Sequence, residues 1–523
     1  MSDRDVDRAA RRLFLSALLL ASALFVTQGL YYARHLIPVP DGVQYLLIGA
    51  KALRGEVGIF DNRLPGNRLP LPFYVLGATQ LTGPNLLAAR WLNVGFGLLT
   101  LMLSAALARR LAGDVAGTLA ALFLATQGVV VAYYSYESYP AFAAFCLMAS
   151  LFVLMGGDSP ARRTLGTALV GLLFFVRSNL WPVIPLLLAW ALWQARTRAE
   201  RVLLVGVVTV PPLLFFAWDP THLKVLAYVP VLRRLVAPLG YVSVFVIDAR
   251  ETLSLAGQLW EVARLLRRYE FWTLAAALLA LVSAWRIRIG RPLGWLAGKT
   301  GVVAVVFACA IGALFVMYSW NFRWIGLYFL PYAPVLALLL GVGFAALLDT
   351  ARARRWPRRL LLIALAVLLL PPLYFVRNPL LPAGHALAQD PFRAAHTAAA
   401  RLRTLVPGDA RVFFYGLNVV YYLAELPVTH LQQAYTPNQF ARIDAPDWVL
   451  KRSGFVTAGE MRDWLTTEAD YAVIDSTFLQ GEIPHFGQTE KEMVTLLERH
   501  FDLLGTVTDY PYDVFAVYRR RSR

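Results

Sequence analysis

The sequence predicts a polytopic α-helical membrane protein with about eleven transmembrane helices and a carboxyl-terminal extracytoplasmic α/β domain. Of its 523 residues 58% are hydrophobic, and the mean hydropathy is +0.54, well above an ordinary soluble domain. Long apolar runs recur up to residue 376, whereas charge rises and such runs vanish from about Asn378. We therefore expect a transmembrane domain over 1–376 and an α/β domain over 377–523.

The transmembrane domain is predicted from run length, because a helix needs roughly 20 apolar residues to cross about 30 Å of hydrocarbon. Runs of about this length lie near 12–30, 86–108, 111–131, 138–156, 179–195, 201–218, 269–285, 301–318, 324–348 and 359–376. A shorter run at 164–176 would span only about 20 Å as a helix, and Arg177 follows it. Residues 164–195 therefore form either one long bent span or two short spans that turn around Arg177.

Charge decides between these two options. The net charge is +17, and most of the excess is arginine in short clusters between apolar runs, a pattern typical of membrane topology rather than of a nucleic-acid face. With eleven spans and a cytoplasmic amino terminus, every short basic cluster lies inside, as the positive-inside rule requires. The first run is then a retained signal anchor, and the long loops 31–85 and 219–268 face outside.

The first outside loop contains "VQYLLIGAKALRG" (43–55), whose apolar residues recur at helical spacing with basic residues at one end. This pattern indicates a helix that lies in the membrane interface and roofs a cavity.

The carboxyl-terminal region alternates between two patterns. Residues 411–416, 471–475, 501–507 and 514–520 are typical of buried strands, and 391–405 and 489–500 of helices. Alternating strands and helices predict a partly parallel sheet. Asp475 ends one of these strands, and we expect it to be structural.

Acidic residues are the most informative candidates for chemistry. None of the predicted spans carries one near its middle, which disfavours a proton- or sodium-coupled transporter. Asp41 and Glu137 instead lie at the outer ends of spans, and Asp61 lies in the first outside loop.

Arg177 and Arg323 are predicted at the same face, where a guanidinium suits a phosphate. Transfer of a sugar from a polyprenyl phosphate needs this set of groups: arginines to stabilise the departing phosphate and one carboxylate to deprotonate an acceptor hydroxyl. A single displacement would invert the anomeric centre. Asp41 is the candidate base and Glu137 a support or metal ligand. Further candidate substrate contacts are Tyr45, Asp61, Arg63 and Arg68.

Each candidate also has a plainer interpretation. Asp41 could cap the interfacial helix, and Glu137 could favour the start of a helix through the macrodipole. Both arginines could reach lipid headgroups, and Arg63 and Arg68 could belong to a rigid proline-rich loop. No histidine pair shows zinc-ligand spacing, so the sequence requires no metal, and a divalent ion stays open as a cofactor.

Four stretches carry a family resemblance: "PDGVQYLLIGAKALRGE", "NLLAARWLNVGFGLLTLMLSAALARRLAG", "GLLFFVRSNLWPVIP" and "NFRWIGLYFLPYAPVLALLLGVG". In their order the chain resembles the C-type membrane glycosyltransferases, in particular the bacterial relatives of protein O-mannosyltransferases and of the aminoarabinose transferase of lipid A. The resemblance covers residues 10–376 and implies that the essential acid of the first outside loop is Asp41. It also implies that Glu137 is a second acid and that Arg177 and Arg323 lie near the lipid phosphate.

The resemblance implies a transferase in a bacterial plasma membrane. Its partners would be a polyprenyl-phosphate sugar donor, membrane lipids and an extracytoplasmic glycan, lipid or protein acceptor. Gly42 follows Asp41 where protein mannosyltransferases commonly carry a second acid. Two other classes stay open: a lipid or glycan transporter, and an inactive scaffold whose α/β domain recruits envelope proteins.

Overall fold

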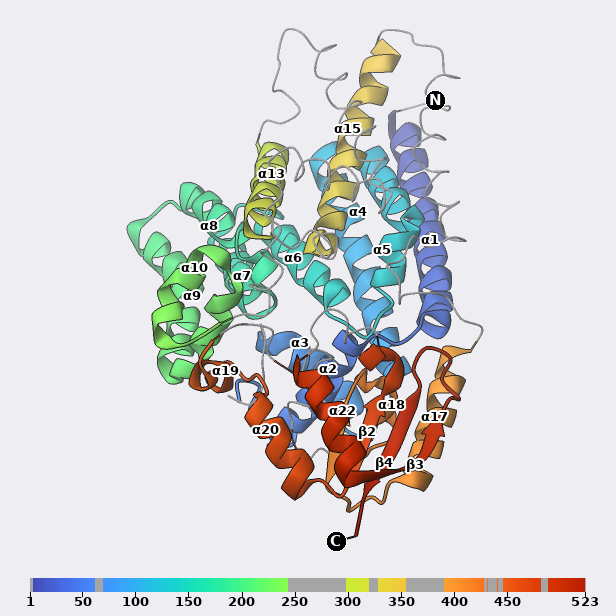
Figure 1. Ribbon diagram of the computed structural model, residues 1–523. Helices are drawn as coiled ribbons and strands as arrows, with labels where there is room; N and C mark the ends of the chain where they lie inside the picture. Colours follow the sequence, from blue (N-terminus) through green and yellow to red (C-terminus); the bar gives the residue numbers. More distant parts are fainter. Residues whose placement is uncertain are drawn as a thin grey trace, which may run out of the picture.

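The computed structural model describes residues 3–61, 69–242, 298–318, 328–353, 390–427, 430, 440, 445–480 and 488–522. The predicted spans 269–285 and 359–376 and the predicted domain boundary lie outside these residues. Figure 1 shows a bundle of helices and, below it in orange and red, the carboxyl-terminal domain.

The described helical elements before this domain are α1 (Asp3–His35), α2 (Pro40–Leu53), α3 (Pro70–Gly77), η1 (Ala78–Gln80), α4 (Leu86–Thr126), α5 (Gly128–Tyr133), α6 (Pro140–Leu154), α7 (Pro160–Leu172), η2 (Leu173–Phe175), η3 (Ser178–Leu180), α8 (Val183–Gln194), α9 (Arg198–Trp218), η4 (Pro220–Tyr228), α10 (Pro230–Val236), η5 (Ala237–Leu239), α13 (Lys299–Tyr318), η7 (Leu330–Tyr332) and α15 (Ala333–Ala353).

Several of these helices are long and apolar enough to cross a membrane. Within the described residues these are Arg11–His35, Leu86–Thr126, Arg198–Trp218 and Leu330–Asp349, and shorter apolar helices cover Pro140–Leu154, Val183–Gln194 and Lys299–Ala313. Each overlaps one predicted run, except Leu86–Thr126, which overlaps the two runs 86–108 and 111–131. The total of eleven spans and their sidedness stay predictions.

The long element α4 is two helices rather than one. Its backbone leaves the helical region at Ala112 and at Gly113, whose φ of 84° favours glycine. A Cβ on Gly117 would lie 2.8 Å from the carbonyl oxygen of Ala105, so the second half packs back against the first. The runs 86–108 and 111–131 were predicted as separate spans, and this hairpin confirms the separation.

The chain also breaks at Arg177, as the sequence predicts. Arg177 has an extended backbone, with φ −161° and ψ 143°, and the short 3₁₀ elements η2 and η3 flank it. Helices α7 and α8 are therefore separate and contact each other, which confirms the option of two short helices over one long bent helix.

The carboxyl-terminal domain is built on a four-stranded sheet of order β1-β2-β4-β3, in which β1 and β2 are parallel and the other pairs antiparallel. Its register pairs Val412 with Tyr471 and Val473 with Val517. The predicted strands, helices and partly parallel sheet are confirmed to within two residues at each end. The described elements are α17 (Pro391–Leu405), β1 (Val412–Tyr415), α18 (Asn418–Leu423), α19 (Asp447–Arg452), α20 (Ala458–Asp463), the π-helical η9 (Trp464–Glu468), β2 (Tyr471–Asp475), α22 (Gln488–His500), β3 (Phe501–Val507) and β4 (Phe515–Arg520).

Helices α2 and α3 lie between the bundle and this domain (Figure 1). They meet at backbone distance, since a Cβ on Gly49 would lie 1.9 Å from the carbonyl oxygen of Phe73. The prediction of a helix in this loop is confirmed. Its environment differs from the expectation of a one-sided interfacial helix, because eight of its 14 residues are buried and α18 of the carboxyl-terminal domain packs on it.

Candidate functional site

The site begins with Asp41 in the first turn of α2. Val39 occupies the N-cap position and Pro40 the first helical position, where its fixed φ favours a helix start. Asp41 is therefore not the capping residue, and its Oδ1 accepts a hydrogen bond of 3.1 Å from Gln44. The structure thus gives no support to the interpretation of Asp41 as a helix cap.

Asp41 is set into the protein yet reachable from outside. Part of the residue is accessible to solvent. The carboxyl group is nevertheless set among many protein atoms, and this desolvation raises its pKa above the ordinary value. The charge of Arg177 and the hydrogen bond from Gln44 act in the opposite direction and are smaller causes. A carboxylate with a raised pKa is a stronger base than an ordinary aspartate.

Arg177 lies close enough to Asp41 for its charge to act on the carboxyl group, and it contacts two tyrosine side chains. Its Nη1 donates a hydrogen bond of 2.8 Å to the hydroxyl of Tyr45, and its Cζ lies 3.9 Å from the ring centroid of Tyr139. Asp41 and Tyr45 are four residues apart on α2 and therefore share a helix face. The structure thus brings together three predicted site residues, Asp41, Tyr45 and Arg177, from α2 and from the break between α7 and α8.

Glu137 lies behind the start of α2 in a buried ion pair with Arg90. Both side chains have 0% exposure, and Nε of Arg90 donates to Oε2 of Glu137. Oε1 of Glu137 accepts a hydrogen bond of 2.7 Å from the backbone N–H of Val39. Glu137 therefore fixes the turn that presents Asp41.

The backbone at Gly42 approaches Glu137 so closely that a side chain has no room. A Cβ at this position would lie 2.4 Å from Cγ of Glu137 and 2.7 Å from its carbonyl oxygen. This contact gives a physical reason for a glycine directly after Asp41.

Arg90 is a buried residue of this site that was not among the residues predicted from the sequence. Its Nη1 donates to the carbonyls of Ala33 at 3.0 Å and Leu36 at 2.6 Å, and its Cζ lies 4.7 Å from the ring of Phe392 in α17. Arg90 therefore links the end of α1, Glu137 and the carboxyl-terminal domain. The sequence feature that could have identified Arg90 is its place as a lone arginine inside an apolar run, because a buried guanidinium needs a partner.

The remaining candidates lie elsewhere. Residues 62–68 and 319–327, which include Arg63, Arg68 and Arg323, are outside the described residues. Asp61 is anchored to η4, because Lys224 donates to its carbonyl oxygen at 2.8 Å and to that of Phe60 at 3.0 Å. Asp475 accepts hydrogen bonds from the backbone N–H of Phe478 and of Leu417, which supports its expected structural role.

A metal site does not emerge from the described part of the chain. No group of three or more His, Cys, Asp or Glu side chains is arranged there to hold an ion. Both oxygens of Glu137 already accept hydrogen bonds from protein donors.

Together the fold and the Asp41 group define a class: a polytopic membrane protein whose α/β domain docks on a short helix that carries an accessible acid. The sequence matches no protein-family model and no curated protein. Solved structures of the same architecture do match. ArnT from Cupriavidus metallidurans in the apo state has a TM-score of 0.60 at 16% identity, over 98% of each chain. The same protein bound to undecaprenyl phosphate has a TM-score of 0.59 at 15% identity, over 96% of this chain and 97% of that one.

The oligosaccharyltransferase of Archaeoglobus fulgidus, tethered with an acceptor peptide, has a TM-score of 0.53 at 12% identity, over 97% of this chain and 74% of that one. The chain therefore has the fold of ArnT and of this oligosaccharyltransferase, which agrees with the predicted resemblance at the level of the fold.

Proposed function

We propose that the protein is an inverting glycosyltransferase that moves a sugar from a polyprenyl-phosphate donor to an extracytoplasmic acceptor. The observation that carries this proposal is the Asp41 group: a carboxyl group with a raised pKa, reachable from outside and beside the guanidinium of Arg177. A base next to a phosphate-binding cation is the pair of groups that such a transfer needs.

In the proposed reaction the bond between the anomeric carbon and the phosphate oxygen breaks, and the phosphate leaves with the electron pair. The acceptor oxygen bonds to the anomeric carbon from the opposite face, while Asp41 takes the hydroxyl proton. Arg177, joined by Arg323, stabilises the charge that develops on the phosphate. The planar fork of a guanidinium matches the geometry of a phosphate, which it can contact through two parallel N–H donors.

Glu137 acts in this proposal by positioning Asp41. Glu137 accepts hydrogen bonds from the backbone N–H of Val39 and from Arg90, and these two contacts hold the first turn of α2. Both join Glu137 to residues that are distant from it in the sequence. Positioning within a fraction of an ångström matters, because a misplacement of about 1 Å can cost a factor of about 100 in rate. Tyr45 orients Arg177 in the same way, and Asp61, Arg63 and Arg68 are proposed as substrate contacts.

We place this reaction at the outer face of a bacterial plasma membrane, with the amino terminus in the cytoplasm and the α/β domain outside. The apolar helices support a membrane location, and the basic clusters between the predicted spans support this orientation. The ArnT structure bound to undecaprenyl phosphate supports a polyprenyl-phosphate donor. The proposal requires no metal, because base and phosphate-binding cation both come from the chain.

The test uses full-length protein in lipid nanodiscs with a panel of polyprenyl-phosphate sugars of known anomeric configuration and a membrane extract as acceptor source. We expect release of polyprenyl phosphate from one donor and a product of inverted configuration, seen in the anomeric couplings of its NMR spectrum. Retention of configuration, or no release with any donor from folded protein, would refute the proposal.

A further inference from the structure

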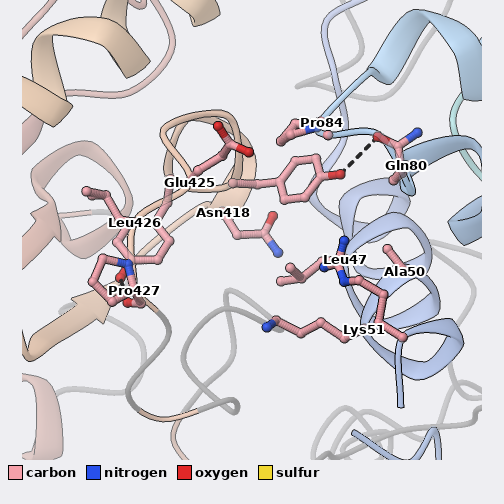
Figure 2. A pocket seen from close by; sticks show the side chains of 13 residues that line it. Leu47, Ala50, Lys51, Gln80, Pro84, Asn418, Glu425, Leu426 and Pro427 are labelled. Carbon is pink, nitrogen blue, oxygen red and sulfur yellow. Dashed lines mark hydrogen bonds between the residues drawn. The ribbon is translucent and has the colours of Figure 1, made fainter. Parts of the chain in front are cut away.

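A pocket of about 310 Å³ lies between α2 and the carboxyl-terminal domain, at the end of α2 opposite to Asp41. Figure 2 shows Leu47 and Lys51 pointing from α2 toward this domain, with Asn418 facing them. Asp41 and Lys51 are ten residues apart, or about 15 Å along a helix. The pocket is therefore separate from the Asp41 group but shares its helix.

The pocket is held in shape by one hydrogen bond between the two parts of the protein and by others within each part. Gln80, which is 2% exposed, accepts at its Oε1 from the hydroxyl of Tyr422 at 2.9 Å and from the backbone of Asn85 at 2.6 Å. Its Nε2 donates to the carbonyl oxygen of Asn85 at 2.9 Å. On the other wall the hydroxyl of Tyr421 donates to Pro427 at 2.6 Å. These contacts build the site before any ligand arrives, which lowers the cost of binding.

Charges of both signs lie at the pocket. Lys51 in the last turn of α2 and Arg54 at its C-cap line the pocket, and both are paired with Glu56, at 2.7 and 2.5 Å. Glu425 lines the opposite side and is paired with Arg403 at 3.1 Å. A bare anion would face Glu425, and a bare cation would face the two basic residues, so the arrangement favours a neutral ligand that both donates and accepts hydrogen bonds.

The other lining groups fit the same kind of ligand. The carboxamide of Asn418 can both donate and accept, and the rings of Tyr421 and Tyr422 add apolar surface with a polar end. The volume is at the low end of the range for small-molecule sites, about 300–1,000 Å³. It therefore suits a group the size of a monosaccharide better than a lipid chain.

We propose that this pocket is a subsite for a neutral sugar residue of the acceptor, distant from the hydroxyl that reacts at Asp41. This inference rests on the proposed function, because only a transferase has an acceptor to hold. Binding along α2 would orient the acceptor toward its amino-terminal end, where the base lies.

The test is saturation-transfer difference NMR of full-length protein in nanodiscs. The probes are methyl glycosides of neutral hexoses, with glucuronate and glucosamine as charged comparisons. We expect binding of a neutral glycoside that Asn418→Ala weakens about fivefold, the effect of one neutral hydrogen bond, and that Lys51→Met weakens about tenfold or more, because a hydrogen bond from a charged group is stronger. Lys491→Met on the exposed side of α22 is the matched control and should bind like the wild type.

A neutral glycoside signal that neither pocket variant changes, no such signal at all, or a preference for a charged sugar would overturn the proposal. Lys51 is partly exposed, so Lys51→Met decides the question if Asn418→Ala does not fold. Asp41→Asn should keep glycoside binding. In the wild type, donor release without any glycoside signal would refute the subsite alone, and glycoside binding without donor release would refute the transferase alone.

Discussion

Replacement of Arg90 by methionine tests whether the buried ion pair positions Asp41. Methionine fills a similar apolar volume but removes the charge and every hydrogen bond that the guanidinium makes. Glu137 then stays buried at 0% exposure without its cation. The carbonyls of Ala33 and Leu36 lose the donor that joins them to this network.

The expected cost follows from the burial of the pair. Removing one partner of a fully buried pair costs about 3–5 kcal/mol, because the other charge is left uncompensated. This is a large share of the roughly 5–15 kcal/mol by which a native protein is stable. Arg90→Met combined with Glu137→Gln should recover part of the loss, since no charge is then buried alone and glutamine can still accept from Val39.

The assay measures thermal unfolding in nanodiscs and donor release per folded molecule. We expect Arg90→Met to lower both, with release falling about 100-fold because the turn that carries Asp41 shifts. Arg163→Met is the matched control: it breaks another mostly buried pair, with Glu200 at 2.6 Å, at the end of α7 far from Arg177. It should lower the unfolding temperature and leave release per folded molecule unchanged. Equal release from Arg90→Met and Arg163→Met would refute the positioning role.

Three further predictions concern the same helix and the carboxyl-terminal domain. Gly42→Ala places a Cβ 2.4 Å from Cγ of Glu137 and should destabilise by about 1–3 kcal/mol and reduce donor release; a neutral effect in both measurements would contradict the contact. The rate of donor release should fall with falling pH through the pKa of Asp41, which burial raises, so the loss should begin at a higher pH than for an ordinary aspartate; a profile flat down to pH 4 would exclude Asp41 as the base. Burial and the nearby carboxylate of Asp475 raise the pKa of Asp513 well above its ordinary value, so its protonated form stabilises the fold at low pH and this contribution is lost as pH rises through the raised pKa. Asp513→Asn should therefore lose less stability than the wild type between pH 6 and 9, and equal slopes in thermal unfolding would contradict this.

The parts that could be predicted from sequence are those set by local pattern. Alternating and continuous apolar runs fix the four strands, and the interruption "RSN" marks the break at Arg177. Helical spacing also predicts that Asp41 and Tyr45 share one face of α2, but it does not predict the hydrogen bond between Tyr45 and Arg177, which are 132 residues apart.

The parts that could not be predicted depend on contacts between distant segments. Arg90 and Glu137 are 47 residues apart, and the sequence around either residue does not indicate that the other is its partner. Part of the burial of α2 comes from α18, which lies in the carboxyl-terminal domain, in addition to that from α3 and η1. An amphipathic pattern shows that a helix has an apolar face, but it does not say whether lipid or protein covers that face.

The role of Asp41 as the general base is tested by the release of polyprenyl phosphate by Asp41→Asn in nanodiscs, with the donor that the wild type uses. Asparagine keeps the shape of the side chain but cannot take the proton. We expect a loss of release of at least about 100-fold, the low end of what a general base contributes. Asp219→Asn, which changes an aspartate that caps η4, should keep wild-type release. Release by Asp41→Asn at the wild-type rate would rule out Asp41 as the base.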